Sequence, residues 1–143
     1  MIVPDINLLL YATIDGFTQH RAARIWFDSI LNGDEPVGLA TPTIFGFIRI
    51  ATNPRVIRPA MSVQQALQAV ETWLSQPHFH CLAPGPRHLE IAFRLLRELG
   101  AAASLTTDVQ LAAYAIENQA ELYSNDVDFG RFAELRWVNP LVG

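Results

Sequence analysis

The stretch AELYSNDVDFGRF, residues 120–132, decides how this sequence folds. A short apolar run ends at Tyr123 and is followed at once by Ser124, Asp126 and Asp128. Two carboxylates directly after a buried strand are destabilising unless a cation or a hydrogen-bond donor offsets their charge. The stretch therefore predicts a strand whose carboxyl end opens onto a polar site.

The rest of the chain alternates short apolar strands with amphipathic helices, which is typical of an α/β fold. All-parallel sheets of this kind are covered by helices on both faces. We therefore expect one domain over residues 1–143, with a short, mostly parallel, Rossmann-like sheet of about five strands. Strands are expected at residues 2–5, 37–40, 79–82, 121–123 and 136–138, and helices at residues 6–12, 18–31, 42–52, 62–76, 85–100 and 106–119.

Local chemistry predicts several helix boundaries. Ser62 is expected to be an N-cap with Gln65 as its capping-box partner. The same helix is expected to carry an apolar stripe that either packs on the core or supplies a groove or dimer face. The stripe consists of Val63, Ala66, Leu67, Val70, Trp73 and Leu74. Gly100 is expected to end the helix that precedes it.

Two strand residues raise separate questions. Pro4 cannot donate a ladder hydrogen bond, so either the first strand starts late or the proline takes a position whose N–H would not be used.

Cys81 lies in the apolar run HFHCLA and is expected to be buried. As the single cysteine, it excludes a disulfide framework and, with no export signal at the N-terminus, indicates a reducing cytoplasm.

Charge and composition exclude several classes of protein. No apolar run approaches the roughly 20 residues that span a bilayer. The formal net charge of −4 argues against a broad nucleic-acid coat. All ten basic residues are arginine. The missing lysine excludes receiver domains, haloacid-dehalogenase-like phosphatases and Walker-type phosphate loops, each of which requires one.

Four acids fall where ligands bind in parallel α/β sheets, beyond the carboxyl ends of the strands. Asp5 follows the first strand, Asp126 and Asp128 follow the fourth, and Asp108 lies in the first turn of a helix. Each also has a structural explanation: a helix N-cap for Asp5, complementation of the helix dipole for Asp108, and an Asx-turn for Asp126 and Asp128. Together they predict a site for Mg²⁺ or Mn²⁺, which prefer oxygen ligands.

Three motifs carry a resemblance to a known family: PDINLLLYA near the start, TTDVQLAAYAIENQAELYSNDVDFGRF near the end, and LRWVNPL at the close. With them the sequence resembles the PIN-domain ribonucleases, and in particular the VapC-type toxins of toxin–antitoxin pairs in the subgroup common in mycobacteria. The resemblance covers nearly the whole chain. It implies a Rossmann-like fold and a Mg²⁺- or Mn²⁺-dependent endoribonuclease.

The resemblance also implies roles for individual residues. Asp5, Asp108 and Asp126 take the positions of the catalytic and metal-binding acids, and Asp128 that of an auxiliary metal ligand. Asn7 and Ser124 take supporting positions.

Gly46 departs from the family pattern. Many members carry a glutamate there, three residues before an arginine that is present here as Arg49. Either Asp128 and water complete the metal shell, or metal binding is weaker. A catalytically weak or inactive PIN fold that binds an antitoxin or RNA is therefore the alternative to the toxin nuclease.

Arg49, Arg55 and Arg58 cluster after the second strand. They are expected either to grip the phosphate backbone of RNA at the rim of the acidic pocket or to be ordinary solvated charges. The resemblance further implies a small VapB-type antitoxin as partner, a homodimer, and a cytoplasmic location.

Overall fold

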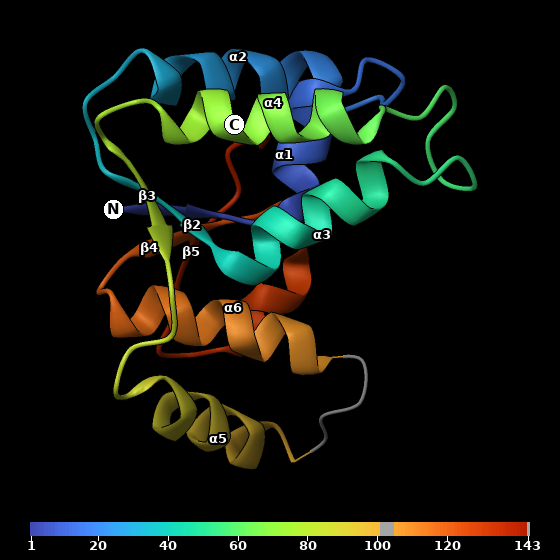
Figure 1. Cartoon of the computed structure of the whole chain (residues 1–143). Coiled ribbons are helices and arrows are strands. Elements are labelled where there is room, and N and C mark those ends of the chain that lie inside the picture. The colour runs from blue at the N-terminus through green and yellow to red at the C-terminus, as the bar shows by residue number, and fades with distance from the viewer. Residues whose placement is uncertain (101–104, 143) are drawn as a thin grey trace.

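The structure, a computed structural model, describes residues 1–100 and 105–142. Within these residues, five strands form one parallel sheet in the order β3-β2-β1-β4-β5 (Figure 1). This confirms the predicted α/β fold with a parallel sheet. The strands are β1 Ile2–Pro4, β2 Val37–Ala40, β3 Phe79–Leu82, β4 Glu121–Tyr123 and β5 Arg136–Val138.

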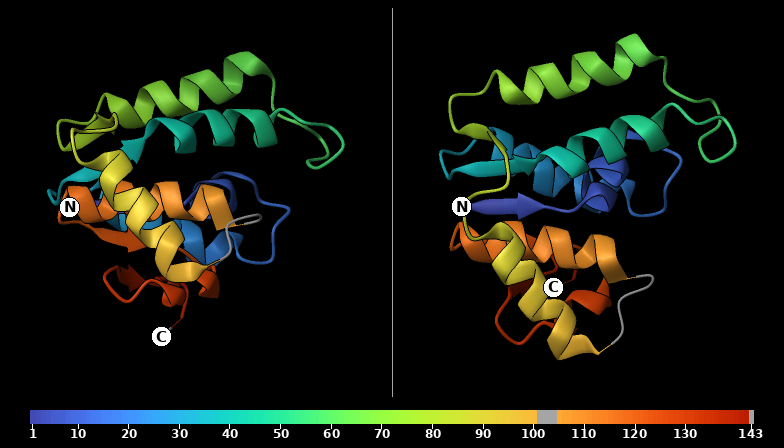
Figure 2. Two further views of the ribbon diagram at one scale, coloured as in Figure 1. Left: turned by 90° about the horizontal axis from the view of Figure 1, so that it is seen from below. Right: turned by 60° about the horizontal axis from the view of Figure 1, so that its bottom comes forward.

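Helices cover both faces of the sheet. The layer of α1 to α4 lies on one side, and α6 lies on the other with α5 packed outside it (Figures 1 and 2). None of the described helices is long and apolar enough to cross a membrane. The helices are α1 Ile6–Thr13, α2 His20–Leu31, α3 Thr41–Ala51, α4 Val63–Leu74, α5 His88–Leu99 and α6 Thr106–Glu117, with a 3₁₀ helix, η2, at Val127–Arg131.

Successive strand residues enter opposite hydrophobic cores, because side chains alternate between the faces of a strand. Ile2 and Leu39 belong to the core beneath α1 to α4, whereas Val3 and Ala40 belong to the core beneath α5 and α6. Burial on both faces explains why the strands read as continuous apolar runs rather than as alternating patterns.

The cap predictions are confirmed, and the apolar stripe of α4 is wider than the face that the helix buries. Ser62 Oγ accepts from the Gln65 N–H at 3.1 Å, and the Gln65 side chain accepts from the Ser62 N–H at 2.9 Å. Gly100 ends α5 in the left-handed region, at φ 71°. Val63 and Leu67 of the predicted stripe are 60% and 41% exposed, so this part of the stripe does not pack on the core. The buried positions of α4 are Ala66, Val70 and Trp73.

Pro4 is the last residue of the central strand β1. The Ile2 N–H donates toward β2, to the carbonyl of Pro36, and alternate residues of a strand point their N–H groups the same way. The Pro4 nitrogen therefore also points toward β2. Among the described residues, β1 pairs with β2 only at Ile2 and Val37, so the proline occupies a position where no ladder hydrogen bond is needed.

The prediction that Cys81 is buried is wrong. Cys81 is exposed, and so is His80 beside it, because β3 is an edge strand whose end residues, Phe79 and Leu82, make the buried contacts. The Cys81 sulfur lies 4.0 Å from the Thr41 hydroxyl oxygen.

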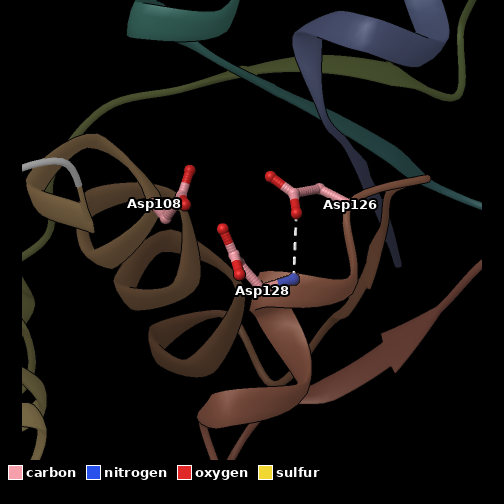
Figure 3. Close-up of side chains that lie close together, drawn as sticks. All are labelled: Asp108, Asp126 and Asp128. Atoms are coloured by element: carbon pink, nitrogen blue, oxygen red, sulfur yellow. Dashed lines mark hydrogen bonds between the residues drawn. The ribbon is translucent and has the colours of Figure 1, made fainter.

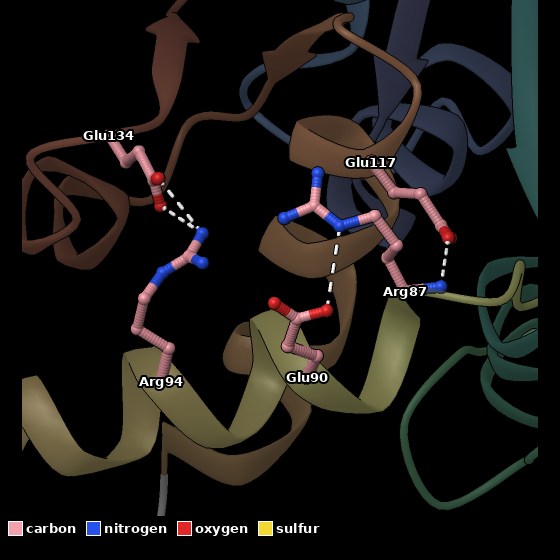
Figure 4. Close-up of polar contacts among 5 residues, drawn as sticks. All are labelled: Arg87, Glu90, Arg94, Glu117 and Glu134. Carbon is pink, nitrogen blue, oxygen red and sulfur yellow. Dashed lines mark hydrogen bonds and ion pairs between the residues drawn. The ribbon is translucent and has the colours of Figure 1, made fainter.

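A group of polar contacts, here termed the α5 polar cluster, holds α5 in place (Figure 4). Glu117 of α6 accepts from the backbone N–H groups of Gly85 and Arg87 at 2.9 and 2.8 Å. Arg94 donates to both carboxylate oxygens of Glu134 at 2.8 Å. These contacts tie α5 and the loop before it to α6 and to the segment before β5. The cluster consists of Arg87, Glu90, Arg94, Glu117 and Glu134.

Candidate active site

The strand order reverses direction between β1 and β4, and the crevice at such a switch point is where parallel α/β sheets bind ligands. Asp5 follows β1 directly, and Ser124 follows β4. Asp108 lies in the first turn of α6, the helix that leads into β4. The topology therefore places residues that are distant in sequence at one edge of the sheet.

Ser124 links two of the predicted site acids. Its side chain is fully buried, and its hydroxyl donates to Asp5 Oδ2 at 2.8 Å. The Ser124 hydroxyl oxygen in turn accepts from the Asp126 N–H at 3.0 Å. Asp5 uses its other oxygen, Oδ1, to accept from the Ile6 N–H at 2.7 Å as the N-cap of α1. One hydroxyl thus fixes the end of β1 against the turn after β4.

Asp108, Asp126 and Asp128 point toward one another (Figure 3). One carboxylate oxygen from each lies within 4.8 Å of the others, and all three side chains are partly buried. The Asp126 Oδ1 accepts from the Asp128 N–H at 2.9 Å, which is the Asx-turn expected of this sequence. The turn therefore serves to aim two carboxylates toward the helix that carries the third.

Asp5 lies beside this group of three rather than within it. Asp5 and Asp108 line a cavity of about 20 Å³ together with Ile6 and Thr43, which is room for one water molecule. Both Asp5 oxygens already accept hydrogen bonds. The structure therefore brings Asp5 to the same site, with its carboxylate oriented by Ser124 and by the start of α1.

Burial, with a smaller contribution from the neighbouring acids, raises two carboxyl pKa values at this site. Burial, followed by the charges of Asp126, Asp5 and Asp128, raises the pKa of Asp108 to about 6. Burial also raises the pKa of Asp5, and the charge of Asp126 adds to the rise, whereas hydrogen bonds from Ser124 and Ile6 lower it. Both shifts mean that the charged forms of these carboxyls are disfavoured at this edge of the sheet, first by burial and then by the charges of the other acids.

The donor set fits a hard divalent cation. Three carboxylates converge within a few ångströms, and Mg²⁺ and Mn²⁺ bind through a few carboxylates while keeping several waters. Within the described ranges, the only salt bridge to any of the three carboxylates comes from Arg131, whose Nε lies 3.5 Å from Asp128 Oδ1 in a largely exposed pair. An exposed pair of this kind contributes little, so the charge of the group is left for a ligand to neutralise.

Gly46 is buried against Ile6. A Cβ at Gly46 would overlap the Cδ1 of Ile6, the residue that follows Asp5. The space that a glutamate would need is therefore filled by an isoleucine side chain. Ile6 lines the cavity at Asp5 and also fills the space beside Gly46. The sequence patterns did not single out Ile6, and its position directly after Asp5 was the available signal.

The remaining predicted residues, which are Asn7 and three arginines, do not line the cavity beside Asp5 and Asp108. Asn7 lies in the first turn of α1, partly buried, and its predicted support of Asp5 stays a prediction. Arg49, Arg55 and Arg58 are exposed, and among the described residues none of them takes part in a salt bridge. Arg58 donates through Nε to the Pro54 carbonyl at 3.0 Å.

Comparison with known proteins agrees with this geometry. The family model of the PIN domain matches residues 2–135. The chain belongs to the PIN-domain family. It is a VapC-type member, 55% identical over 141 residues to Ribonuclease VapC33 of Mycobacterium tuberculosis, with 99% of each chain covered.

Two solved structures share the fold of this PIN domain at low sequence identity. VapBC2 from Rickettsia felis, bound to a DNA fragment from its promoter, superposes with a TM-score of 0.71 at 15% identity over 97% of this chain and 98% of that one. VapC20 of M. tuberculosis, a sarcin-ricin loop cleaving toxin, superposes with a TM-score of 0.69 at 18% identity. The match covers 95% of this chain and 99% of that one.

Proposed function

We propose that this PIN domain is a metal-dependent endoribonuclease and the toxin of a type II toxin–antitoxin pair. The observation that carries the proposal is the convergence of Asp108, Asp126 and Asp128 at the switch point of the sheet, in a chain 55% identical to a protein named as a ribonuclease. Carboxylates that raise one another's pKa are typical of catalytic metal sites.

In this proposal Asp108, Asp126 and Asp128 hold Mg²⁺ or Mn²⁺, and Asp5 contributes to the same site. The ion would supply neutralisation of charge at the scissile phosphate and acidification of a bound water. Asp5 would orient the attacking water, because Ser124 and the Ile6 N–H fix its carboxylate at the edge of the cavity shared with Asp108.

Arg49, Arg55 and Arg58 would bind the RNA on either side of the cleaved bond. Their exposed guanidinium groups lack salt-bridge partners among the described residues, so they are available to phosphates. Local positive charge of this kind is needed because the chain as a whole carries a net charge of −4.

The solved VapBC complex motivates the remaining parts of the proposal. A small VapB-type antitoxin would hold the toxin inactive in the cytoplasm. A homodimer of the toxin is part of the same proposal, and RNA is its substrate.

The second candidate is a PIN fold that binds antitoxin or RNA without cleaving. Gly46 favours it, since Ile6 fills the space of the carboxylate found in many members. The two candidates differ in whether the three acids act on RNA.

The test is cleavage of purified RNA by the isolated toxin, with Mg²⁺ or Mn²⁺ and with EDTA. We expect metal-dependent cleavage by wild type and at least about a hundredfold less by Asp126→Asn. Glu134→Gln is the matched control, because it alters an acid of the α5 polar cluster outside the site. Equal cleavage by wild type and Asp126→Asn would exclude the acid site. No cleavage by wild type with either metal would favour the binding module.

A further inference from the structure

A second concave site lies at the same edge of the sheet as the acids. It is a groove of about 720 Å³ between the α1–α2 loop and the α3–α4 loop. These two loops project side by side beyond the ends of α1 and α3 (Figure 1). Both helices begin beside the acids, and the eight residues of α1 span about 12 Å. The groove is therefore a short distance from the proposed site of cleavage.

The walls of the groove are apolar and are fixed before any ligand arrives. Phe17 packs edge-on against Tyr11, with ring centroids 5.0 Å apart. On the opposite wall, Ile57 is 5% exposed, and its N–H donates to the Asn53 carbonyl at 2.9 Å. Val56 beside it is 59% exposed. A volume of this size with apolar walls and a few polar groups is typical of a site for a small organic group.

Three polar side chains also line the groove. Asp15, on the α1–α2 loop, is exposed and has no hydrogen bond or salt bridge to any residue that the structure describes. Arg58, on the α3–α4 loop, donates through Nε to the Pro54 carbonyl. Its two terminal amino groups are therefore available to a ligand. His20 Nδ1 lies 2.7 Å from the Tyr11 carbonyl oxygen. A carboxylate and a guanidinium thus line one groove from opposite loops without pairing with each other.

We propose that this groove binds an unpaired nucleobase of the RNA next to the cleaved bond, and that Asp15 selects guanine. The inference rests on the proposed ribonuclease function. Guanine carries two N–H donors on its Watson–Crick edge, which match the two acceptor oxygens of Asp15. Its O6 and N7 acceptors match the donors of an arginine such as Arg58. The base plane would lie against the apolar walls at Phe17 and Val56.

The charge around the groove fits RNA. Arg49 and Arg55 are exposed on α3 and on the loop that follows it, and they have no salt-bridge partner among the described residues. Arg55 precedes Val56, Ile57 and Arg58 of the groove lining in the chain, and Arg49 lies in the last turn of α3, which leads into the same loop. A base drawn out of a single strand, with its backbone held by arginine, is a common mode of sequence-specific RNA recognition.

The experiment is cleavage of short unstructured RNA of random sequence, with the cut ends read by sequencing. Wild type is expected to show guanine enriched about tenfold at one position close to the cut. Asp15→Asn is expected to shift that preference toward adenine, because an amide offers one acceptor and one donor and so matches the edge of adenine. Arg58→Met is expected to weaken it. Asp34→Asn and Arg97→Met alter exposed residues outside the groove and should leave the guanine preference unchanged.

Each other outcome has a definite meaning. A base preference that Asp15→Asn leaves unchanged, or no preference in wild type, would overturn the assignment of the groove while keeping the ribonuclease function. An unchanged cleavage pattern combined with weaker antitoxin binding by the groove variants would assign the groove to a protein and overturn the proposal. Absence of any cleavage by wild type would overturn the proposed function and this inference together.

Discussion

The acids of this protein fall into two contrasting groups. In the α5 polar cluster, Glu117 and Glu134 each accept two hydrogen bonds from N–H donors (Figure 4). At the candidate site, Asp108, Asp126 and Asp128 face one another (Figure 3). The first group has hydrogen-bond donors within the protein and holds α5 in place. The second group is left with net charge that the fold does not neutralise, which is the condition for binding a cation.

The largest expected difference between the two groups of acids is in how much added metal stabilises variants of each group. In buffer cleared with EDTA and then supplied with Mn²⁺ at a hundred times its Kd, wild type should gain about 2.7 kcal/mol of stability. Asp126→Asn should lose this gain and Glu134→Gln should keep it. Thermal unfolding across a titration of Mn²⁺ and Mg²⁺ measures the effect. The same rise in Tm in wild type and Asp126→Asn would place the metal elsewhere.

Restoring the missing glutamate sharpens the contrast by adding an acid to the site. Gly46→Glu alone should lower the free energy of unfolding by about 2 kcal/mol, because its Cβ overlaps Ile6. Combined with Ile6→Ala, it should regain part of that stability and bind Mn²⁺ more tightly than wild type. Chemical denaturation and metal titration report the two effects. Weaker metal binding by the double variant would show that the position does not face the ion.

Neutralising an acid of the α5 polar cluster should destabilise the protein. Glu117→Gln keeps one acceptor but removes the charge that serves the N–H groups of Gly85 and Arg87. We expect a loss of about 1.5 kcal/mol in the free energy of unfolding, measured by urea denaturation in EDTA. A neutral or stabilising effect would remove the distinction between the two groups of acids.

Neutralising an acid of the candidate site should raise the free energy of unfolding, by less than the loss expected for Glu117→Gln. The folded-state pKa of Asp108, about 6, lies above the ordinary carboxyl value, so folded protein binds more protons than unfolded protein between about pH 4 and pH 6. In that window, stability falls as pH rises, and the penalty is complete above it. Metal-free Asp108→Asn should therefore be more stable than wild type at pH 7, by about 1 kcal/mol after allowance for solvent screening.

The check is urea denaturation of both proteins in EDTA from pH 3.5 to pH 8. The two stabilities should converge as the pH falls below about 4, because the carboxyl then becomes protonated in both states of wild type. A variant less stable than wild type at pH 7 would mean that Asp108 is held by favourable contacts, as the acids of the α5 polar cluster are.

The sequence was sufficient for the parts of the structure that depend on local chemistry. The order of strands and helices, the capping box at Ser62 and the helix end at Gly100 follow from patterns of a few residues. The gathering of the acids was also predictable, because the carboxyl ends of parallel strands share one edge of the sheet.

Features that depend on which neighbour covers a surface were not predictable. Val63 and Leu67 continue an apolar stripe, yet no described element packs over them deeply enough to bury them. Ile6 reads as an ordinary helix residue, and only the packing of α1 on α3 brings it against Gly46. The position of Asp5 beside the other three acids, rather than among them, depends on the hydrogen bond from Ser124.

The exposed Cys81 has a practical consequence for the question of subunit number. It is an accessible thiol on the edge strand of the sheet, and such thiols oxidise to intermolecular disulfides in air. Protein purified without a reducing agent would therefore run as a covalently linked pair whatever its association in the cell. A Cys81→Ser variant, compared with wild type with and without reductant during size determination, separates a native homodimer from one formed during purification.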